Sequence, residues 1–346
     1  MTAAEPVSGS GASGSGSGAS CDPGVDRDPG PRLDEVDEEA VLARILPLMR
    51  GGGPDVLVGP GDDAAVLRTG GRTVVTTDTM VRGRDWRDDW SSAQDVGAKL
   101  VAQNLADVAA MGAVPTGIVV TLVAEPATRL GWVEGFAEGV AQAASRAQVP
   151  VIGGDLSSAP AGTVVVSITA LGEVDPAGPV LRSGARIGDR LAVCGSLGRS
   201  AAGLQLLGAG RGHAAPDLVT AHRRPEPPLH AGPEAARAGA TAMLDLSDGL
   251  IRDGLRVARA SGVRLDLSVQ ALAADVAALV PFVGPADAWE CVLGGGEEHS
   301  LLATFPAAPP LGWRVVGRVC RGEGLTLGGE PTPVRGWDHF GRSARG

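Results

Sequence analysis

Aspartates recur along this chain in short clusters framed by glycine, serine or threonine. Carboxylates held close together raise one another's pKa, so they stay ionised only where cations lie among them. Aspartate oxygens beside hydroxyl groups suit a hard divalent ion such as Mg²⁺, which usually retains waters and bridges to substrate phosphates. We therefore expect a metal-assisted site for a nucleotide or a phosphate ester. The clusters are Gly61-Asp62-Asp63, Thr76-Thr77-Asp78, Asn104-Leu105-Ala106-Asp107, Gly153-Gly154-Asp155 and Asp245-Leu246-Ser247-Asp248-Gly249.

The chain contains a single lysine, Lys99, and this excludes the lysine-dependent phosphate sites. A P-loop needs Gly-Lys followed by Ser or Thr, whereas Leu100 follows Lys99. A protein kinase needs a Val-Ala-Ile-Lys strand and a His-Arg-Asp loop, and the sequence has neither. Metal ions and arginines must therefore neutralise phosphate charge. Arg182 is the arginine that we expect to bind phosphate, because it lies at the expected joint between two domains. The alternative interpretation is that Arg182 is a solvated surface charge.

Composition limits the class of protein. The chain has 346 residues, 44% of them apolar, which is typical of a globular protein with room for two domains. A net charge of −10 argues against a nucleic-acid or anionic-membrane surface. No apolar stretch approaches the roughly 18 residues of a membrane span, and residues 2–20 lack the features of a secretory signal, so we expect a cytoplasmic protein. The four cysteines are far apart, which indicates neither a zinc site nor a disulfide framework.

The order of the expected elements predicts an α/β (α+β) fold in two domains. Residues 1–30 are rich in Gly and Ser, and we expect a disordered tail. Strand and helix patterns then alternate. A Pro- and Gly-rich stretch at 175–188 is the expected joint between a metal- and ATP-binding domain, residues 31–178, and a C-terminal domain, residues 179–346.

The same elements are expected to position the clusters. A strand over 72–77 should present Thr77 and Asp78 at its end, and a short strand over 149–152 should run into the Gly153 cluster. A helix that begins after Ser91 or Ser92 and ends before Gly112 places Asn104 and Asp107 on one face. A strand over 241–245 should end at Asp245, with Ser247 capping the next helix.

Each cluster alone has an equally good structural interpretation as an Asx turn, a helix cap or a chain turn. Five clusters, mostly at strand ends or helix starts where α/β folds bind ligands, favour a site. A sixth cluster follows a Gly-rich turn and contains Glu297, Glu298 and His299. We interpret His299 as a core or strand-edge residue rather than a ligand.

The ordered set of motifs resembles the thiamine-monophosphate kinase family over residues 33–340. The motifs that carry the resemblance are residues 59–65, 76–79, 99–113, 153–155, 182–185, 245–250, 295–297 and 336–340. The resemblance implies the two-domain fold of aminoimidazole ribonucleotide synthetase, with a C-terminal α/β sandwich and N-terminal domains that pair in a homodimer. It also implies phosphorylation of thiamine monophosphate to thiamine diphosphate by ATP, with several Mg²⁺ ions.

The resemblance further assigns roles by position. Metal ligands would be Asp63, Thr76, Thr77, Asp78, Asp107, Asp155, Asp245 and Asp248, and nucleotide contacts would be Gly154, Arg182 and Ser247. Acceptor contacts would be Glu297, Trp337 and Asp85, which stands where the family usually has a histidine. Glu298-His299 likewise replaces the usual Asp-Tyr pair.

The expected chemistry needs no general base. The acceptor is a phosphate monoester whose second pKa is near 6, so its oxygen is already largely anionic at neutral pH. We expect direct in-line transfer without a phosphoenzyme. The alternatives are another ATP-dependent enzyme of the same superfamily or a non-catalytic nucleotide- and metal-binding homologue. Selenophosphate synthesis is disfavoured, because Cys21 is followed by Asp22 with no lysine nearby.

Overall fold

A computed structural model describes residues 29–49, 53–58 and 65–337, and every structural statement below concerns these residues. The expected disordered tail therefore lies outside the described residues up to position 28. The predicted metal ligand Asp63 lies outside them as well, as do the last residues of the C-terminal motif.

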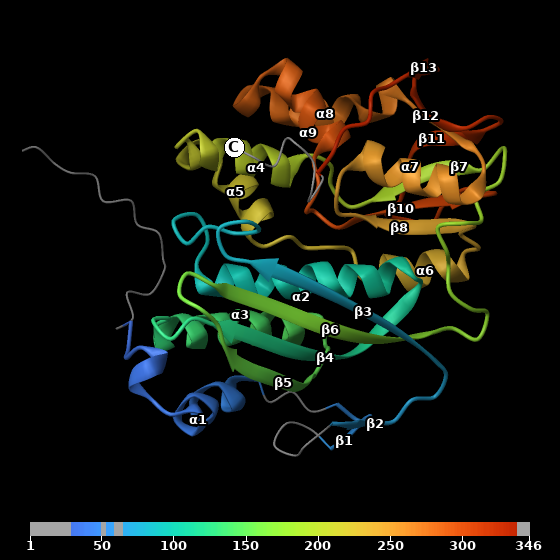
Figure 1. Ribbon diagram of the computed structural model, residues 1–346. Helices are drawn as coiled ribbons and strands as arrows, with labels where there is room; N and C mark the ends of the chain where they lie inside the picture. Colours follow the sequence, from blue (N-terminus) through green and yellow to red (C-terminus); the bar gives the residue numbers. More distant parts are fainter. Residues whose placement is uncertain (1–28, 50–52, 59–64, 338–346) are drawn as a thin grey trace, which may run out of the picture.

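The N-terminal half is built on a four-stranded sheet in the order β3-β6-β4-β5. Strands β3, β6 and β4 are antiparallel neighbours, and β5 pairs with β4 in parallel. Helices α2 and α3 cover one face of this sheet, and α1 packs against α3 (Figure 1). The elements are η1 (Leu33–Glu35), α1 (Glu38–Met49), β1 (Val56–Val58), β2 (Val66–Leu67), β3 (Arg72–Val81), α2 (Ala93–Ala110), β4 (Ala113–Ala124), α3 (Leu130–Arg146), β5 (Val151–Ser158) and β6 (Val164–Val174).

The C-terminal half is built on a seven-stranded sheet in the order β13-β12-β9-β11-β7-β10-β8. Its strands are antiparallel except for the β12 and β9 pair. The strands are β7 (Arg190–Cys194), β8 (Ala242–Leu246), β9 (Arg264–Leu267), β10 (Ser300–Phe305), β11 (Arg314–Cys320), β12 (Gly324–Leu327) and β13 (Glu330–Pro331). The helices are α4 (Arg199–Gly208), η2 (Gly212–Ala214), α5 (Pro216–Arg223), α6 (Ala231–Arg237), α7 (Leu250–Ser261), α8 (Val269–Val283) and α9 (Pro285–Gly294).

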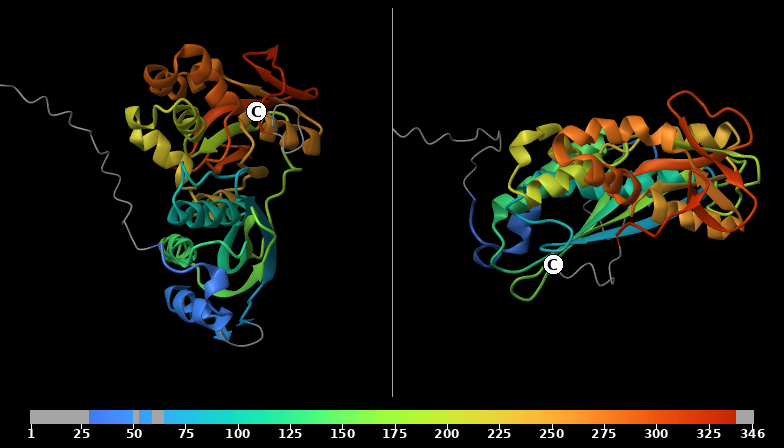
Figure 2. Two further views of the ribbon diagram at one scale, coloured as in Figure 1. Left: turned by 60° about the vertical axis from the view of Figure 1, so that its left-hand side comes forward. Right: turned by 90° about the horizontal axis from the view of Figure 1, so that it is seen from above.

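Helix α2 lies between the two sheets and belongs to the packing of both halves (Figures 1 and 2). One side contacts β3, β6 and β4, and the other contacts β8, β10, α5 and α6. Ala110 at its end joins an apolar cluster with Met243 of β8 and Leu301 of β10. The outer face of the C-terminal sheet is covered by α4, α7, α8 and α9. The mixed α/β class predicted from the sequence is thus confirmed.

The sequence predicted the ends of α2 correctly but the extents of two strands wrongly. Ser92 caps α2 by accepting the backbone N–H of Asp95 at 3.2 Å, and Gly112 follows the helix with φ of +72°. Strand β3 does not end at Thr77, because residues up to Val81 pair with β6. Strand β5 includes the Gly153 cluster, which pairs with β4 rather than forming a turn.

The other face of the N-terminal sheet has no described helix over it (Figure 2). Val75 on edge strand β3 is 61% exposed there, and Thr77 and Thr79 follow it at the two-residue period of a strand. An open face with valine and threonine side chains is a candidate interface. None of the helices in the described part of the chain is long and apolar enough to cross a membrane.

Residues 29–31 dock onto the start of α3. The carbonyl oxygen of Pro29 accepts the N–H of Gly131 at 3.0 Å, and that of Pro31 accepts the N–H of Leu130 at 2.8 Å. The first N–H groups of a helix have no partner inside it, so these bonds satisfy donors that would otherwise need water.

Removal of residues 1–28 should leave both melting temperature and activity unchanged, since that segment is too poor in apolar residues to contribute a core. Removal of residues 1–32 should lower the melting temperature by a few degrees, because it deletes the bonds to α3. Thermal denaturation of the two truncated proteins tests this. Equal melting temperatures for the two would contradict it.

Candidate functional site

A cavity of about 860 Å³ lies between the two halves and collects most of the described residues that the sequence singled out. The N-terminal half contributes β3, α2 and the segment 83–91. The C-terminal half contributes the end of β8, parts of α4, α5, α7 and α9, and loop residues that include the segment before β10. The predicted residues that line it are Asp78, Asp85, Asp107, Arg182, Asp245, Ser247, Asp248, Glu297 and Trp337.

Side chains of α2 bind the unpaired edge of strand β3 and so fix the wall of the cavity that the N-terminal half contributes. The buried Asn104 side chain accepts the backbone N–H of Asp78 at 2.9 Å and donates to the carbonyl of Leu100 at 2.8 Å. One turn further on, Asp107 accepts the hydroxyl of Thr76 at 2.8 Å. An edge strand leaves its outward N–H groups unpaired, so Asn104 satisfies one of them and holds Asp78 at the cavity.

Asp245 supplies the facing carboxylate from the end of β8. It is 5% exposed, and its Oδ2 accepts the ring N–H of His299 at 3.0 Å. Burial opposes protonation of His299, but its hydrogen bond to Asp245 and the charges of Asp245 and Glu297 outweigh burial and raise the pKa. His299 is 5% exposed and directly precedes β10, which agrees with our interpretation of it as a core or strand-edge residue. It also lines the cavity, and that interpretation did not include its contact with Asp245.

The carboxylates of the two halves affect one another. Burial, followed by the charges of Asp245 and Asp78, raises the pKa of Asp107 from 3.8 to about 6. In the described part of the chain, no three Asp, Glu, His or Cys side chains are close enough to form a metal cage by themselves. Mg²⁺ usually binds through one or two carboxylates plus waters and phosphate oxygens, so these facing carboxylates fit that ion.

Asp253, in the first turn of α7, stabilises the turn that precedes this helix. Its side chain is fully buried and accepts the N–H groups of Asp248 at 2.8 Å and Gly249 at 3.0 Å. Gly249 has φ of +116° and takes the N-cap position that we predicted for Ser247. Arg256 pairs with both Asp248 and Asp253. The carboxylate of Asp253, in the first turn of α7, therefore fixes the turn that places Ser247 and Asp248 at the cavity.

The predicted acceptor residue Glu297 pairs with Lys99, to which our sequence analysis gave no role in the site. Its Oε1 lies 2.8 Å from Lys99 Nζ, and its Oε2 lies 3.4 Å from His222 Nδ1. Burial opposes ionisation of Glu297, but the charge and hydrogen bond of Lys99, together with the charges of His222 and His299, outweigh burial and lower the pKa of Glu297. Burial and Lys99 lower the pKa of His222 to about 4, so this imidazole is neutral at pH 7.

The two departures from the family motif have structural roles. Glu298 is buried, and its Oε1 accepts the N–H of Ser200 at 2.7 Å in the first turn of α4. Asp85 accepts the N–H of Val81 at 2.7 Å and so closes the turn after β3. The carboxylates of Glu298 and Asp85 each accept a backbone N–H, so the fold accommodates both substitutions.

Tryptophans anchor the segment that carries Asp85. Trp86 is 5% exposed and stacks on Trp132 of α3 with ring centroids 6.2 Å apart. Trp90 lines the cavity, and the guanidinium of Arg87 lies 4.2 Å from its ring centroid. Trp337 also lines the cavity, and its backbone N–H donates to the carbonyl of Asp248 at 3.0 Å.

Four predicted residues do not line the cavity of their own chain. Thr76 lies behind Asp107, and Thr77 points to the opposite face of the sheet, where it contacts Thr169. Gly154 and Asp155 are exposed on edge strand β5. Their assignments as metal or nucleotide contacts stay predictions.

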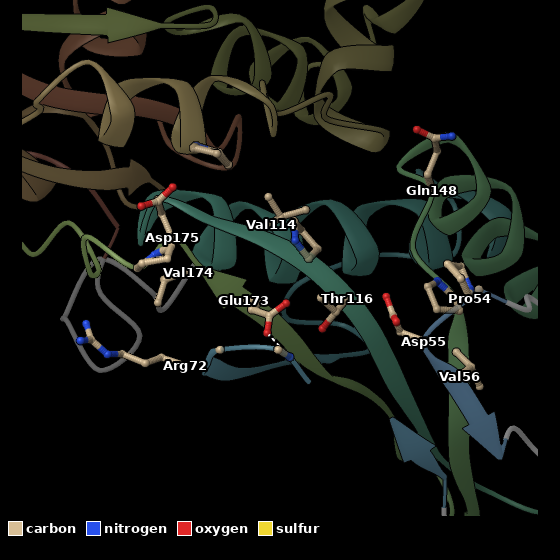
Figure 3. Close-up of a pocket in the computed structure, with 18 of the residues that line it drawn as sticks. Pro54, Asp55, Val56, Arg72, Val114, Thr116, Gln148, Glu173, Val174 and Asp175 are labelled. Atoms are coloured by element: carbon tan, nitrogen blue, oxygen red, sulfur yellow. Dashed lines mark hydrogen bonds between the residues drawn. The ribbon is translucent and has the colours of Figure 1, made fainter. Parts of the chain in front are cut away.

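A second cavity, of about 850 Å³, lies near the start of β3 and the end of β6 (Figure 3). Arg72 and Asp175 lie at its border, and Oε1 of Glu173 accepts the N–H of Gly70 at 2.6 Å. None of the predicted site residues that the structure describes lines it.

The order of these elements and the composition of the site agree with comparisons to known proteins. Residues 61–174 match the family model of AIR synthase related protein, N-terminal domain. The chain is 46% identical over 316 residues to the thiamine-monophosphate kinase of Mycobacterium tuberculosis, and the match covers 90% of this chain and 94% of that protein. The chain belongs to the thiamine-monophosphate kinase family. It is thus an enzyme of the phosphotransferase class, as the sequence predicted.

Solved structures of thiamine-monophosphate kinases share the fold. The enzyme of Stenotrophomonas maltophilia aligns with a TM-score of 0.73 at 31% identity, over 84% of this chain and 95% of that one. The structure described as AaThiL complexed with AMPPCP and TMP aligns with a TM-score of 0.71 at 29% identity, over 90% of this chain and 99% of that one.

The raised pKa of Asp107 predicts how stability changes with pH. A carboxyl group whose pKa is higher in the fold, here about 6 against 3.8, stabilises the fold while protonated. This contribution is complete below about pH 4 and is lost as pH rises through about 6. Metal-free wild-type protein should therefore lose melting temperature relative to Asp107→Asn as pH increases across this interval.

Thermal denaturation in the presence of a chelator, from pH 4 to 8, measures the difference between the two proteins. Above pH 6, Mg²⁺ should stabilise the wild type more than the variant, because the ion binds the ionised carboxylate. Parallel curves for the two proteins, with or without Mg²⁺, would show that Asp107 has an ordinary pKa.

Proposed function

We propose that this chain phosphorylates thiamine monophosphate to thiamine diphosphate with ATP as the phosphate donor. The observation that carries the proposal is the cavity in which Asp78 and Asp107 of one half face Asp245 of the other. Two polyanionic substrates need such a cation-binding site between them. A relative of the same fold is described as complexed with AMPPCP and TMP, which supports the same pair of ligands here.

Several Mg²⁺ ions are part of the proposal. The residues that would hold them are Asp78, Asp107, Asp245 and Asp248 at the cavity, together with the predicted ligands Asp63, Thr76, Thr77 and Asp155. Bound Mg²⁺ supplies charge neutralisation and alignment of the phosphate oxygens for in-line transfer. The chain itself orients these ligands, since Asn104 holds the backbone at Asp78, and His299 donates to Asp245.

We assign no general base. The acceptor oxygen of a phosphate monoester is largely ionised at neutral pH, so no side chain has to remove a proton. Direct transfer then depends on placement of the two substrates. Arg182 and Ser247 are proposed for the nucleotide, and Asp85, Glu297 and Trp337 for the acceptor. The carboxylates of Asp85 and Glu297 complement the cationic ring of thiamine.

We also propose that two chains pair through the uncovered face of the N-terminal sheet. The exposed Val75 and the hydroxyl groups of Thr77 and Thr79 support this. Light scattering at micromolar concentration should give twice the mass of one chain, and a single-chain mass would refute the pairing. We keep the cytoplasm as the expected location of the enzyme.

Product analysis tests the proposed activity directly. The protein incubated with ATP, Mg²⁺ and thiamine monophosphate should form ADP and thiamine diphosphate in equal amounts. Nucleotide binding without either product would favour the non-catalytic homologue. Formation of ADP only with another acceptor would favour a related ATP-dependent enzyme.

Asp78→Asn should abolish turnover while leaving the metal-free protein folded and at least as stable, because one charge leaves a crowded acidic site. Stabilisation by Mg²⁺ with ATP should shrink in the variant. Steady-state kinetics and thermal shift measure the two effects. Glu39→Gln, which removes an exposed carboxylate from α1, is the control and should behave like the wild type. Near-normal turnover of Asp78→Asn would refute its role as a ligand.

Trp337→Ala should weaken binding of thiamine monophosphate about tenfold, since a cation over an aromatic face contributes roughly 0.5–2 kcal/mol and 1.4 kcal/mol is a factor of ten. ATP binding should change little. Calorimetric titration of each ligand measures this, with Trp337→Phe as the variant that retains an aromatic face. Equal losses for the two ligands, or a collapse of the melting temperature, would identify Trp337 as structural.

A further inference from the structure

Lys99 is a buried charge at the centre of the molecule. It is the only lysine of the chain, its side chain is 6% exposed, and it lies on α2 between the two sheets. A buried ammonium group is costly unless a counter-charge lies close to it. The partner is Glu297 of the C-terminal half, whose Oε1 lies 2.8 Å away.

Both the backbone and the side chain of Glu297 make contacts that fix its position. Its backbone has φ of +64°, which is uncommon for a residue other than glycine, and its N–H donates to the carbonyl of Ser247 at 2.9 Å. Its second carboxylate oxygen lies 3.4 Å from His222 Nδ1, and this ring lies 3.1 Å from the hydroxyl of Ser200. The Glu297 side chain is still 38% exposed and lines the cavity.

Lys99 acts behind the cavity wall rather than in it. Gln103, one turn later on α2, lines the cavity with Glu297, and Asp107 lines it one further turn on. Residues four apart share a helix face, so a single face of α2 carries both the metal-site carboxylate and the cation that holds Glu297. A flexible glutamate side chain would otherwise sample several rotamers, and fixing it in advance reduces the entropy lost on binding.

We propose that Lys99 is a positioning residue for the acceptor: through its ion pair it holds the Glu297 carboxylate at the cavity wall, where that carboxylate binds the cationic part of the acceptor. The proposal rests on the proposed function. It gives Lys99 a role in acceptor recognition beyond that of a bridge between the two halves.

The test compares the KM values for the two substrates in Lys99→Met, which keeps the side-chain length without the charge, and in Glu297→Gln. Each variant should raise the KM for thiamine monophosphate about tenfold or more and change the KM for ATP less than twofold. The double variant should be no worse than either single one, because both remove the same interaction. Lys99→Arg should recover part of the loss.

Arg314→Met is the control, since it breaks a 2.8 Å ion pair with Asp275 that lies outside the cavity, and it should change neither KM. Three results would overturn the role of Lys99: an unchanged KM for thiamine monophosphate in Lys99→Met or in Glu297→Gln, equal rises for both substrates, or additive effects in the double variant. If Lys99→Met does not fold, Glu297→Gln and Lys99→Arg decide by the same criterion.

Absence of turnover in the unmutated protein would overturn the proposed function as well, whereas turnover with one of these three results overturns the positioning role alone.

Discussion

The site depends on the burial of α2 between two sheets. A helix that is enclosed on both sides must satisfy each of its polar side chains within the protein. Asn104 does so on the N-terminal side through the backbone of Asp78, and Lys99 does so on the C-terminal side through Glu297. Both contacts end at residues that line the cavity. The requirements of burial therefore fix the two walls of the site at the same time, from one rigid element.

Local sequence patterns correctly predicted the ends of an element where residues close by in the sequence determine those ends. The cap at Ser92 and the positive φ of Gly112 bound α2 as expected. Strand lengths were harder, because β3 extends as far as residues of β6 far along the chain can pair with it. The α7 cap was missed for a similar reason, since the buried Asp253 carboxylate binds the turn from within the helix and leaves Ser247 free to face the cavity.

Acidic residues of the site were predictable from their clustering, whereas the two histidines that contact them were not. His299 and His222 are single histidines whose contacts come from distant segments, so spacing in the sequence carries no signal for them. Lys99 had a signal: it lies two helical turns before Asp107 on the same side of α2. A lone lysine on the polar side of an otherwise apolar helix, aligned with a site carboxylate, was sufficient reason to include it in the site.

Two of the predicted residues that one chain does not bring to its cavity, Thr77 and Asp155, lie on the open face of the N-terminal sheet. By register, Thr79 lies beside Ser167, Ser167 beside Thr121, and Thr121 beside Asp155, so these residues form one row across the four-stranded sheet. Thr77 lies in the adjacent row. This is the sheet that α2 and α3 cover on one side only. A ligand role for Thr77 or Asp155 and the pairing of two chains through this sheet are therefore linked, since the open face places both residues where a second chain would lie. Evidence against pairing would leave these two residues without a route to the metal site.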